Sequence, residues 1–280
     1  MNVIDEATET VLTQRYGPVL LLTLNRPKRL NAWTDEMEDR YFSCLSTAES
    51  DPDVRAIVVT GAGRGFCAGA EMADLTKVEL SLGELPTGRA IARSHPLYMR
   101  KPMIAAINGA AAGLGLVEAL YCDVRFAVPD AKLTTAFTRR GLIAEYGAAW
   151  LLERIVGYST ALDLLLSGRV ITGGEALEIG LVNRLSDPET LVADAIGYAQ
   201  DLAAHCSPTA MAVVKQQVRD AAGGDFQAAA SDADKAAREA LGRVDIKEGV
   251  ASYLEKRSPH FPALGAAGDL EAVAPRADGR

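Results

Sequence analysis

Short apolar runs alternate with more polar stretches through the first half of the chain. Residues 56–60 (AIVVT) and 103–107 (MIAAI) are continuous and apolar, which predicts two buried strands. Further strands are predicted at residues 8–14, 19–24 and 124–127. Thr34 is a suitable N-cap for a helix that ends near Glu49. This alternation of strands and helices favours a mostly parallel, layered α/β core.

From about residue 143 onward the strand signals fade and helical patterns dominate. The predicted helices cover residues 147–156, 158–166, 174–179, 188–204, 208–222 and, with a break, 225–256. Residues 76–98 contain glycines and prolines that predict a loop with short helical pieces beside a site. We therefore expect a core over residues 1–200, a C-terminal helical region over 201–262 and a weakly ordered tail over 263–280.

Two glycine-rich turns follow the two buried strands. Residues 61–72 read GAGRGFCAGAEM and residues 108–115 read NGAAAGLG, and each turn leads into a predicted helix. The first turn of a helix leaves backbone N–H groups without an intrahelical acceptor. Two such turns side by side would each offer one N–H group to a single anionic oxygen, which predicts an oxyanion hole.

Composition and charge narrow the possible partners. Hydrophobic residues make up 49% of the chain and charged residues 24%, as in an ordinary enzyme. The net charge of −8 argues against a nucleic-acid partner, because binding phosphates requires a basic surface. No apolar run approaches the roughly 20 residues that span a bilayer. The first residues also lack a secretory signal, so we expect a cytoplasmic protein without a membrane partner.

Cysteine and histidine patterns give no support for metal or serine-hydrolase chemistry. The four cysteines and three histidines show no metal-ligand spacing, and no Gly-x-Ser-x-Gly motif occurs around them. We therefore expect no bound metal. Cys67 lies in the first glycine turn, where it is either a nucleophile or a small buried residue. The second interpretation is the commoner one for cysteine.

Seven short motifs occur along the chain in a fixed order. They are LNRPKRLNA at 24–32, FCAGAE at 66–71, KPMIAAING at 101–109, CD at 122–123, SGRVIT at 167–172, EALEIGLV at 175–182 and YLEKR at 253–257. Together they resemble the crotonase (enoyl-CoA hydratase/isomerase) superfamily over about residues 8–262. The resemblance implies an α/β spiral of ββα units and a C-terminal helical trimerisation region. It also implies a homotrimer or a dimer of trimers.

The resemblance implies an acyl-coenzyme A thioester as substrate, with no cofactor beyond the coenzyme A (CoA) that the substrate carries. It assigns the two oxyanion N–H donors to Ala70 and Leu114. The superfamily usually has glycine at the second position. A backbone donor does not depend on the side chain, but the bulk of Leu114 is expected to narrow the acyl pocket.

The same resemblance suggests where CoA binds. Lys28 or Arg29 would approach its phosphates, and the Ala68 carbonyl region would meet its adenine. Tyr253 and Lys256 occupy positions that complete the CoA site of a neighbouring subunit in relatives.

The two glutamates that add water to an enoyl thioester in well-known members are missing. Ungapped comparison places those two positions at Val117 and Phe137, which would line the substrate pocket without exchanging a proton. Glu118 is adjacent to Val117, but one residue along a helix turns a side chain by about 100°. We interpret Glu118 as solvated or structural.

One acid remains at a position that other branches of the superfamily use. Glu145 lies where dienoyl-CoA isomerases and aryl-CoA dehalogenases carry a catalytic aspartate. Its apolar neighbours predict a raised pKa and an acid/base role. The alternative is an N-cap or first-turn acid of the helix that follows. Arg139 and Arg140 are candidate partners for Glu145 or Glu118.

These residues favour an acyl-CoA enzyme that stabilises a thioester enolate, with Glu145 as acid/base. Overall similarity makes enoyl-CoA hydratase the nominal activity. A lone carboxylate also suits enoyl- or dienoyl-CoA isomerisation, or acyl-CoA hydrolysis. A catalytically silent acyl-CoA-binding protein is the alternative from another class, because both usual carboxylates are missing.

Overall fold

The computed structural model describes residues 9–71, 91–221 and 223–265. Two sheets form its core. The larger has the strand order β1-β2-β3-β5-β7-β10, and the smaller has the order β4-β6-β8-β9. The larger sheet comprises β1 (Val11–Tyr16), β2 (Val19–Leu24), β3 (Ala56–Gly61), β5 (Met103–Ile107), β7 (Val124–Ala127) and β10 (Arg184–Leu185). The smaller comprises β4 (Gly65–Cys67), β6 (Ala110–Ala112), β8 (Lys132–Thr134) and β9 (Ile171–Thr172).

From β3 to β8, successive strands of the chain alternate between the two sheets. The chain passes from β3 to β4, from β5 to β6 and from β7 to β8, so each step adds one strand to each sheet. Strands β2, β3, β5, β7 and β10 are parallel, and β1 pairs antiparallel with β2. The predicted α/β spiral of ββα units is confirmed. Strands β2, β3, β5 and β7 were predicted at their observed places. The first strand was predicted at residues 8–14 but spans Val11–Tyr16, and the two- and three-residue strands were not predicted.

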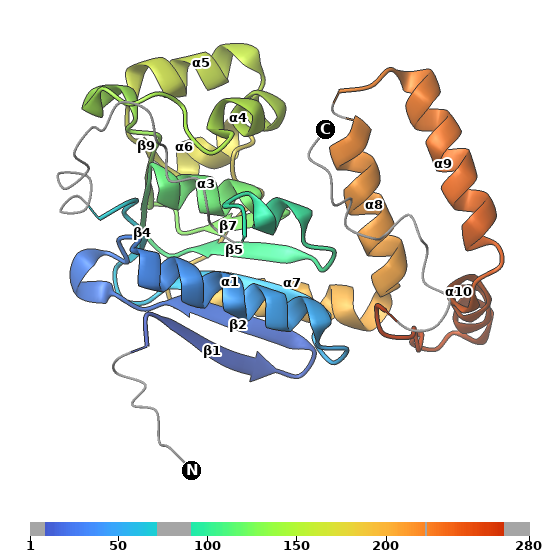
Figure 1. Cartoon of the computed structure of the whole chain (residues 1–280). Helices are drawn as coiled ribbons and strands as arrows, with labels where there is room; N and C mark the ends of the chain where they lie inside the picture. The colour runs from blue at the N-terminus through green and yellow to red at the C-terminus, as the bar shows by residue number, and fades with distance from the viewer. Residues whose placement is uncertain (1–8, 72–90, 222, 266–280) are drawn as a thin grey trace.

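Helices cover the sheets and close the core (Figure 1). The helices are α1 (Asp35–Ser50), α3 (Leu114–Tyr121), α4 (Ala148–Val156), α5 (Tyr158–Ser167), α6 (Gly173–Glu178), α7 (Leu191–His205), α8 (Pro208–Ala221), α9 (Phe226–Ala240) and α10 (Val244–Glu255), with 3-10 turns η1 (Pro27–Arg29), η2 (His95–Tyr98) and η3 (Thr138–Arg140). Helix α7 packs along β2, β3, β5 and β7 through small buried residues that include Ala195 and Ala199. Thr34 caps α1 as predicted, because its hydroxyl accepts a hydrogen bond from the Met37 N–H.

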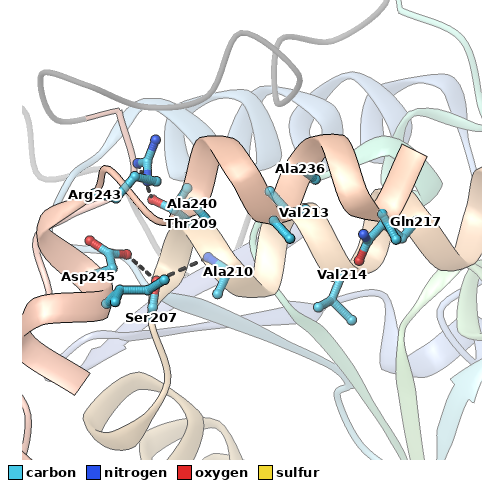
Figure 2. A pocket seen from close by; sticks show the side chains of 13 residues that line it. Ser207, Thr209, Ala210, Val213, Val214, Gln217, Ala236, Ala240, Arg243 and Asp245 are labelled. Atoms are coloured by element: carbon cyan, nitrogen blue, oxygen red, sulfur yellow. Dashed lines mark hydrogen bonds between the residues drawn. The ribbon is translucent and has the colours of Figure 1, made fainter. Parts of the chain in front are cut away.

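Helices α8, α9 and α10 form a C-terminal arm beside the core (Figure 1). Every α9 residue is described, and none of them is buried. A hollow of about 220 Å³ lies between α8 and α9, and five of its thirteen lining residues are alanines (Figure 2). At one end of it the Ser207 hydroxyl donates a hydrogen bond to the Asp245 carboxylate. The predicted core ended at residue 200, but α7 continues unbroken past that residue. The arm begins after α7. Most of the predicted 76–98 loop and of the predicted tail lies outside the described residues.

Candidate active site at two glycine turns

The two glycine turns pack directly against each other. A Cβ atom at Gly115 would lie 2.1 Å from the Cys67 carbonyl oxygen, which is an impossible contact. A Cβ atom at Gly69 would lie 2.7 Å from the Ala112 carbonyl oxygen and 3.7 Å from the Leu114 nitrogen. Gly69 also has a φ of +93°, which favours glycine. Glycine at both places therefore permits the close approach that makes Ala70 and Leu114 neighbours.

Ala70 and Leu114 carry uncommitted backbone N–H groups. Leu114 is the first residue of α3, so its N–H has no intrahelical acceptor. Within the described part of the chain, neither N–H donates to a backbone carbonyl. The adjacent residues differ, since the Glu71 N–H donates to the Trp33 carbonyl and the Gly113 N–H donates to the Thr134 carbonyl, both at 3.0 Å. The predicted donor positions are thus available for an oxygen placed between the turns.

Two asparagine side chains fix the shape of these turns. Asn31 is fully buried, and its amide donates to three carbonyl oxygens of the first turn, those of Ala62, Gly65 and Phe66, at 3.0, 2.8 and 3.1 Å. Asn108 starts the second turn, and its amide donates across to the carbonyls of Gly61 and Gly63, at 2.8 and 2.9 Å. Neither role was predicted from the sequence, although Asn31 lies in the motif at residues 24–32 and Asn108 in the motif at residues 101–109.

The positions of the two missing glutamates are apolar and buried. Val117 is on the first turn of α3, where its N–H donates to the Gly113 carbonyl. Phe137 lies beside the same turn, because a Cβ atom at Gly113 would be 3.9 Å from its ring. Cys67 is fully buried, and burial raises the pKa of its thiol to about 12. None of these three side chains exchanges a proton readily.

Glu145 lies on the loop between η3 and α4. Its side chain is half-buried, and burial raises the pKa of the carboxyl while the Arg93 charge opposes that rise. Within the described residues the carboxyl has no hydrogen bond or ion pair. The alternative role as an N-cap or first-turn acid of α4 is wrong: Gly147 is the N-cap, and the first turn of α4 holds no acid.

Glu118 is buried, so the interpretation of this residue as solvated is wrong. The residue is 2% exposed, and both carboxyl oxygens are without a hydrogen-bond partner among the described residues. Burial raises the pKa of this carboxyl to about 8, again opposed by Arg93. The physical reason is that every residue of α3 is buried, so this helix has no solvent-facing side.

The two arginines suggested as partners for these acids bind elsewhere. Arg139 donates to the Ser167 carbonyl at 2.7 Å, and Arg140 donates to the Ala136 carbonyl at 3.2 Å. The cation that acts on both acids is instead Arg93, whose charge opposes the rise in pKa that burial causes. The sequence did not point to Arg93.

The structure brings together three of the five residues suggested for CoA. Lys28 and Arg29 are exposed on η1, and the Ala68 N–H donates to the Leu30 carbonyl at the end of that turn. Tyr253 and Lys256 lie on and just after α10, on the opposite side of the molecule from β4 (Figure 1). Within one chain they therefore do not meet the other three residues.

Within residues 9–71, 91–221 and 223–265, no group of three His, Cys, Asp or Glu side chains is arranged to hold a metal ion. In the same ranges no helix has the length and apolar character needed to cross a membrane.

A two-sheet ββα spiral with two abutting glycine turns defines a class of proteins that includes known enoyl-CoA hydratases. An enoyl-CoA hydratase from Polaromonas sp. JS666 has a TM-score of 0.83 and 29% identity, over 90% of this chain and 99% of that one. The chain belongs to the enoyl-CoA hydratase/isomerase family, whose sequence model matches residues 14–263.

Two further relatives have higher identity. The 1,2-epoxyphenylacetyl-CoA isomerase of Escherichia coli K12 is 38% identical over 263 residues, which cover 90% of this chain and 98% of that protein. An enoyl-CoA hydratase structure from Mycobacterium marinum is 44% identical, with a TM-score of 0.65, over 75% of this chain and 97% of that one. The chain is therefore similar both to proteins named as hydratases and to one named as an isomerase.

Proposed function

We propose that this protein is an acyl-CoA isomerase that relocates a proton along the acyl chain, with Glu145 as its single acid/base. The observation that carries the proposal is the half-buried Glu145 carboxyl with its raised pKa, while the residues at positions 117 and 137 are buried and apolar. Val117 and Phe137 leave no second acid at the positions that activate water in two-glutamate hydratases. A single carboxyl is sufficient for an isomerisation, since the same group takes the proton and returns it.

The proposed reaction moves one proton and shifts a double bond by one carbon. The Glu145 carboxylate removes a proton from the carbon next to the thioester carbonyl; the electron pair of that C–H bond forms the C=C bond of the enolate, and the carbonyl π pair moves onto the oxygen. The N–H groups of Ala70 and Leu114 donate hydrogen bonds to the enolate oxygen; losing one such donor typically costs about 10²–10³-fold in rate. When the carbonyl re-forms, the enolate C=C pair becomes the double bond between the second and third carbons, and the pair of the original double bond between the third and fourth carbons takes the proton from Glu145 at the fourth carbon.

Replacement of Glu145 by glutamine tests the proposal. The amide keeps the shape of the side chain but cannot accept the proton, so we expect turnover to fall by at least about 10²-fold while CoA binding is retained. A panel of enoyl, dienoyl, oxo-acyl and aryl thioesters is followed by mass spectrometry. Isomerisation conserves mass, hydration adds water, and hydrolysis releases free CoA. Glu153→Gln on α4 is the matched control, because that acid is exposed and pairs with Arg154.

The nominal hydratase activity is a competing outcome of the same panel, favoured by the names of several relatives. Hydration that depends on Glu145 would mean that this acid activates water. Turnover that persists in Glu145→Gln would contradict its catalytic role. A wild-type protein that binds CoA but turns over none of the thioesters would support the silent binding protein.

We also propose that the C-terminal arm assembles the protein into a trimer or a dimer of trimers. The arm exposes large apolar side chains that a monomer would leave in water; they include Val244, Val250, Tyr253 and Leu254. In such an assembly Tyr253 and Lys256 would reach the CoA site of a neighbouring copy, together with that copy's Lys28, Arg29 and Ala68.

A further inference from the structure

Arg93 lies at the centre of a partly buried polar cluster formed by segments far apart in sequence. Its Nε is 2.9 Å from a carboxylate oxygen of Glu38 on α1. The Glu38 side chain is only 1% exposed, and it also accepts a hydrogen bond from the Trp33 indole at 2.8 Å. A buried carboxylate with two such donors holds the guanidinium in one place.

The other face of this cluster is Tyr146, the residue that follows Glu145. Arg93 donates to the Tyr146 hydroxyl at 2.6 Å, and its guanidinium lies 4.8 Å from the centre of the tyrosine ring. The Tyr121 hydroxyl of α3 donates to the Tyr146 backbone carbonyl, also at 2.6 Å. Both ends of Tyr146 are therefore held by side chains from other elements.

Tyr146 requires this support because its backbone is strained. Its φ is +55°, a left-handed conformation that costs a bulky residue about 1–3 kcal/mol. The peptide unit that joins Tyr146 to Glu145 is oriented by this conformation. Loss of the contacts that hold it would allow the loop to relax and the Glu145 carboxyl to turn.

Arg93 also acts on the neighbouring acids through its positive charge. The positive charge of Arg93 interacts with two carboxyl groups, and it favours the ionised form of both Glu145 and Glu118. Among the described residues, the titratable groups around the cluster are Glu38 from α1, Tyr98 from η2, Glu118 and Tyr121 from α3, and Glu145 and Tyr146 from the loop.

We propose that Arg93 is a positioning residue: together with Glu38 and Tyr121 it holds Tyr146, and thereby orients Glu145. The positive charge of Arg93 acts on the Glu145 carboxyl in addition to this geometric role. The proposal rests on the catalytic role proposed for Glu145. It assigns a task to a cation and a tyrosine that no motif in the sequence marked.

Removal of the charge gives the first test. In Arg93→Gln the pKa of Glu145 should rise further, because the neighbouring cation is gone. A carbon-detected NMR titration of the glutamate carboxyls measures this without any substrate, with the Glu145 signal assigned by its loss in Glu145→Gln. An unchanged Glu145 titration in Arg93→Gln would overturn the electrostatic part of the proposal.

Kinetics with the thioester that the panel identifies give the second test. We expect kcat of Arg93→Gln to fall by about a hundredfold, as for a displaced catalytic group, and the acid limb of its pH profile to move to higher pH. Tyr146→Phe should lower kcat with a smaller movement of that limb, because the charge remains. Arg93→Lys should keep the limb near its wild-type position, and this variant also serves if Arg93→Gln does not fold.

Arg100→Gln is the matched control, since Arg100 pairs with Glu49 at 2.5 Å in the same stretch of chain without contacting Tyr146. Its kcat and pH profile should match those of the wild type. An inactive Glu145→Gln beside a fully active Arg93→Gln would refute only the positioning role. An active Glu145→Gln would instead refute the proposed function.

Discussion

Glu118 shows how strongly a single environment changes the chemistry of a side chain. A carboxyl without hydrogen-bond partners is costly to ionise in an apolar interior, so it keeps its proton at pH values where an exposed glutamate is charged. The raised pKa of about 8 therefore means a neutral Glu118 at pH 7. Tyr41 is a neighbouring group with the same property, because its buried hydroxyl has no partner in the described part of the chain and the pKa of that hydroxyl is raised by burial.

Glu118→Gln should change how stability depends on pH. The unfolded chain releases this proton near the ordinary value of 4.5, whereas the folded chain keeps it until about 8. The contribution of Glu118 to folding is therefore complete below pH 4.5 and is lost as pH rises through 8, by up to about 1.4 kcal/mol per pH unit. Glutamine does not titrate, so the variant should be more stable than the wild type at alkaline pH.

Urea unfolding of both proteins from acidic to alkaline pH measures this difference. Parallel stability curves for the wild type and Glu118→Gln would show that the carboxyl is not buried as described. Glu153→Gln, which removes an exposed acid, should leave the pH dependence nearly unchanged.

At the scale of elements, the contact between β4 and α3 fixes the site. Gly115 on α3 meets the Cys67 backbone so closely that no side chain fits between them. A β4 backbone atom cannot move aside as a flexible side chain would, because β4 is paired with β6 in the smaller sheet. The separation of the two glycine turns is therefore set by packing of main chain on main chain.

Gly115→Ala should force these two elements apart. We expect a loss of stability of about 1–3 kcal/mol or more from overpacking, and a fall in turnover because the Ala70 and Leu114 N–H groups would separate. Thermal unfolding and the thioester assay measure the two effects. Gly197→Ala on α7 is the control, since no atom lies within 4 Å of its Cβ position and helix propensity should make it neutral or stabilising. Wild-type stability in Gly115→Ala would contradict the described contact.

The elements that the sequence predicted well are those with strong local signals. Thr34 marks the start of α1, and the apolar runs of β3 and β5 are long enough to identify. Strands β4 and β6 escaped prediction because each has three residues, and they are strands only by virtue of pairing with distant segments.

Some features of the candidate site could likewise be predicted from the sequence and others could not. The glycine turns and the apolar residues Val117 and Phe137 follow from local motifs and spacing. The burial of Glu118 depends instead on what surrounds all sides of α3, which no local pattern contains. Arg93 was missed because its partner Tyr146 is 53 residues away, so only the folded chain brings the two together.

At the scale of the whole molecule, the C-terminal arm exposes several large apolar side chains, among them Val244, Tyr253 and Leu254. Tyr253 is 84% exposed, and α9 buries none of its residues, all of which are described. Contact with another copy would remove this surface from water, which favours association in proportion to the apolar area buried.

Leu254→Glu should therefore weaken assembly, because it places a charge in the proposed interface. Analytical ultracentrifugation should show smaller species than the wild type, and titration calorimetry should show weaker CoA binding if Tyr253 and Lys256 complete a neighbour's site. Leu254→Met keeps the apolar volume and should assemble normally. A wild-type protein that sediments as a monomer would contradict the proposal for the arm.

The main-chain packing of Gly69 and Gly115 also bears on how proteins of this family diverge. The N–H groups that it brings together belong to the backbone, so their placement survives replacement of the side chains at Leu114, Val117 and Phe137. An acid introduced at one of these three positions would therefore meet the same pair of N–H groups, because main-chain packing and not the side chains sets where they lie.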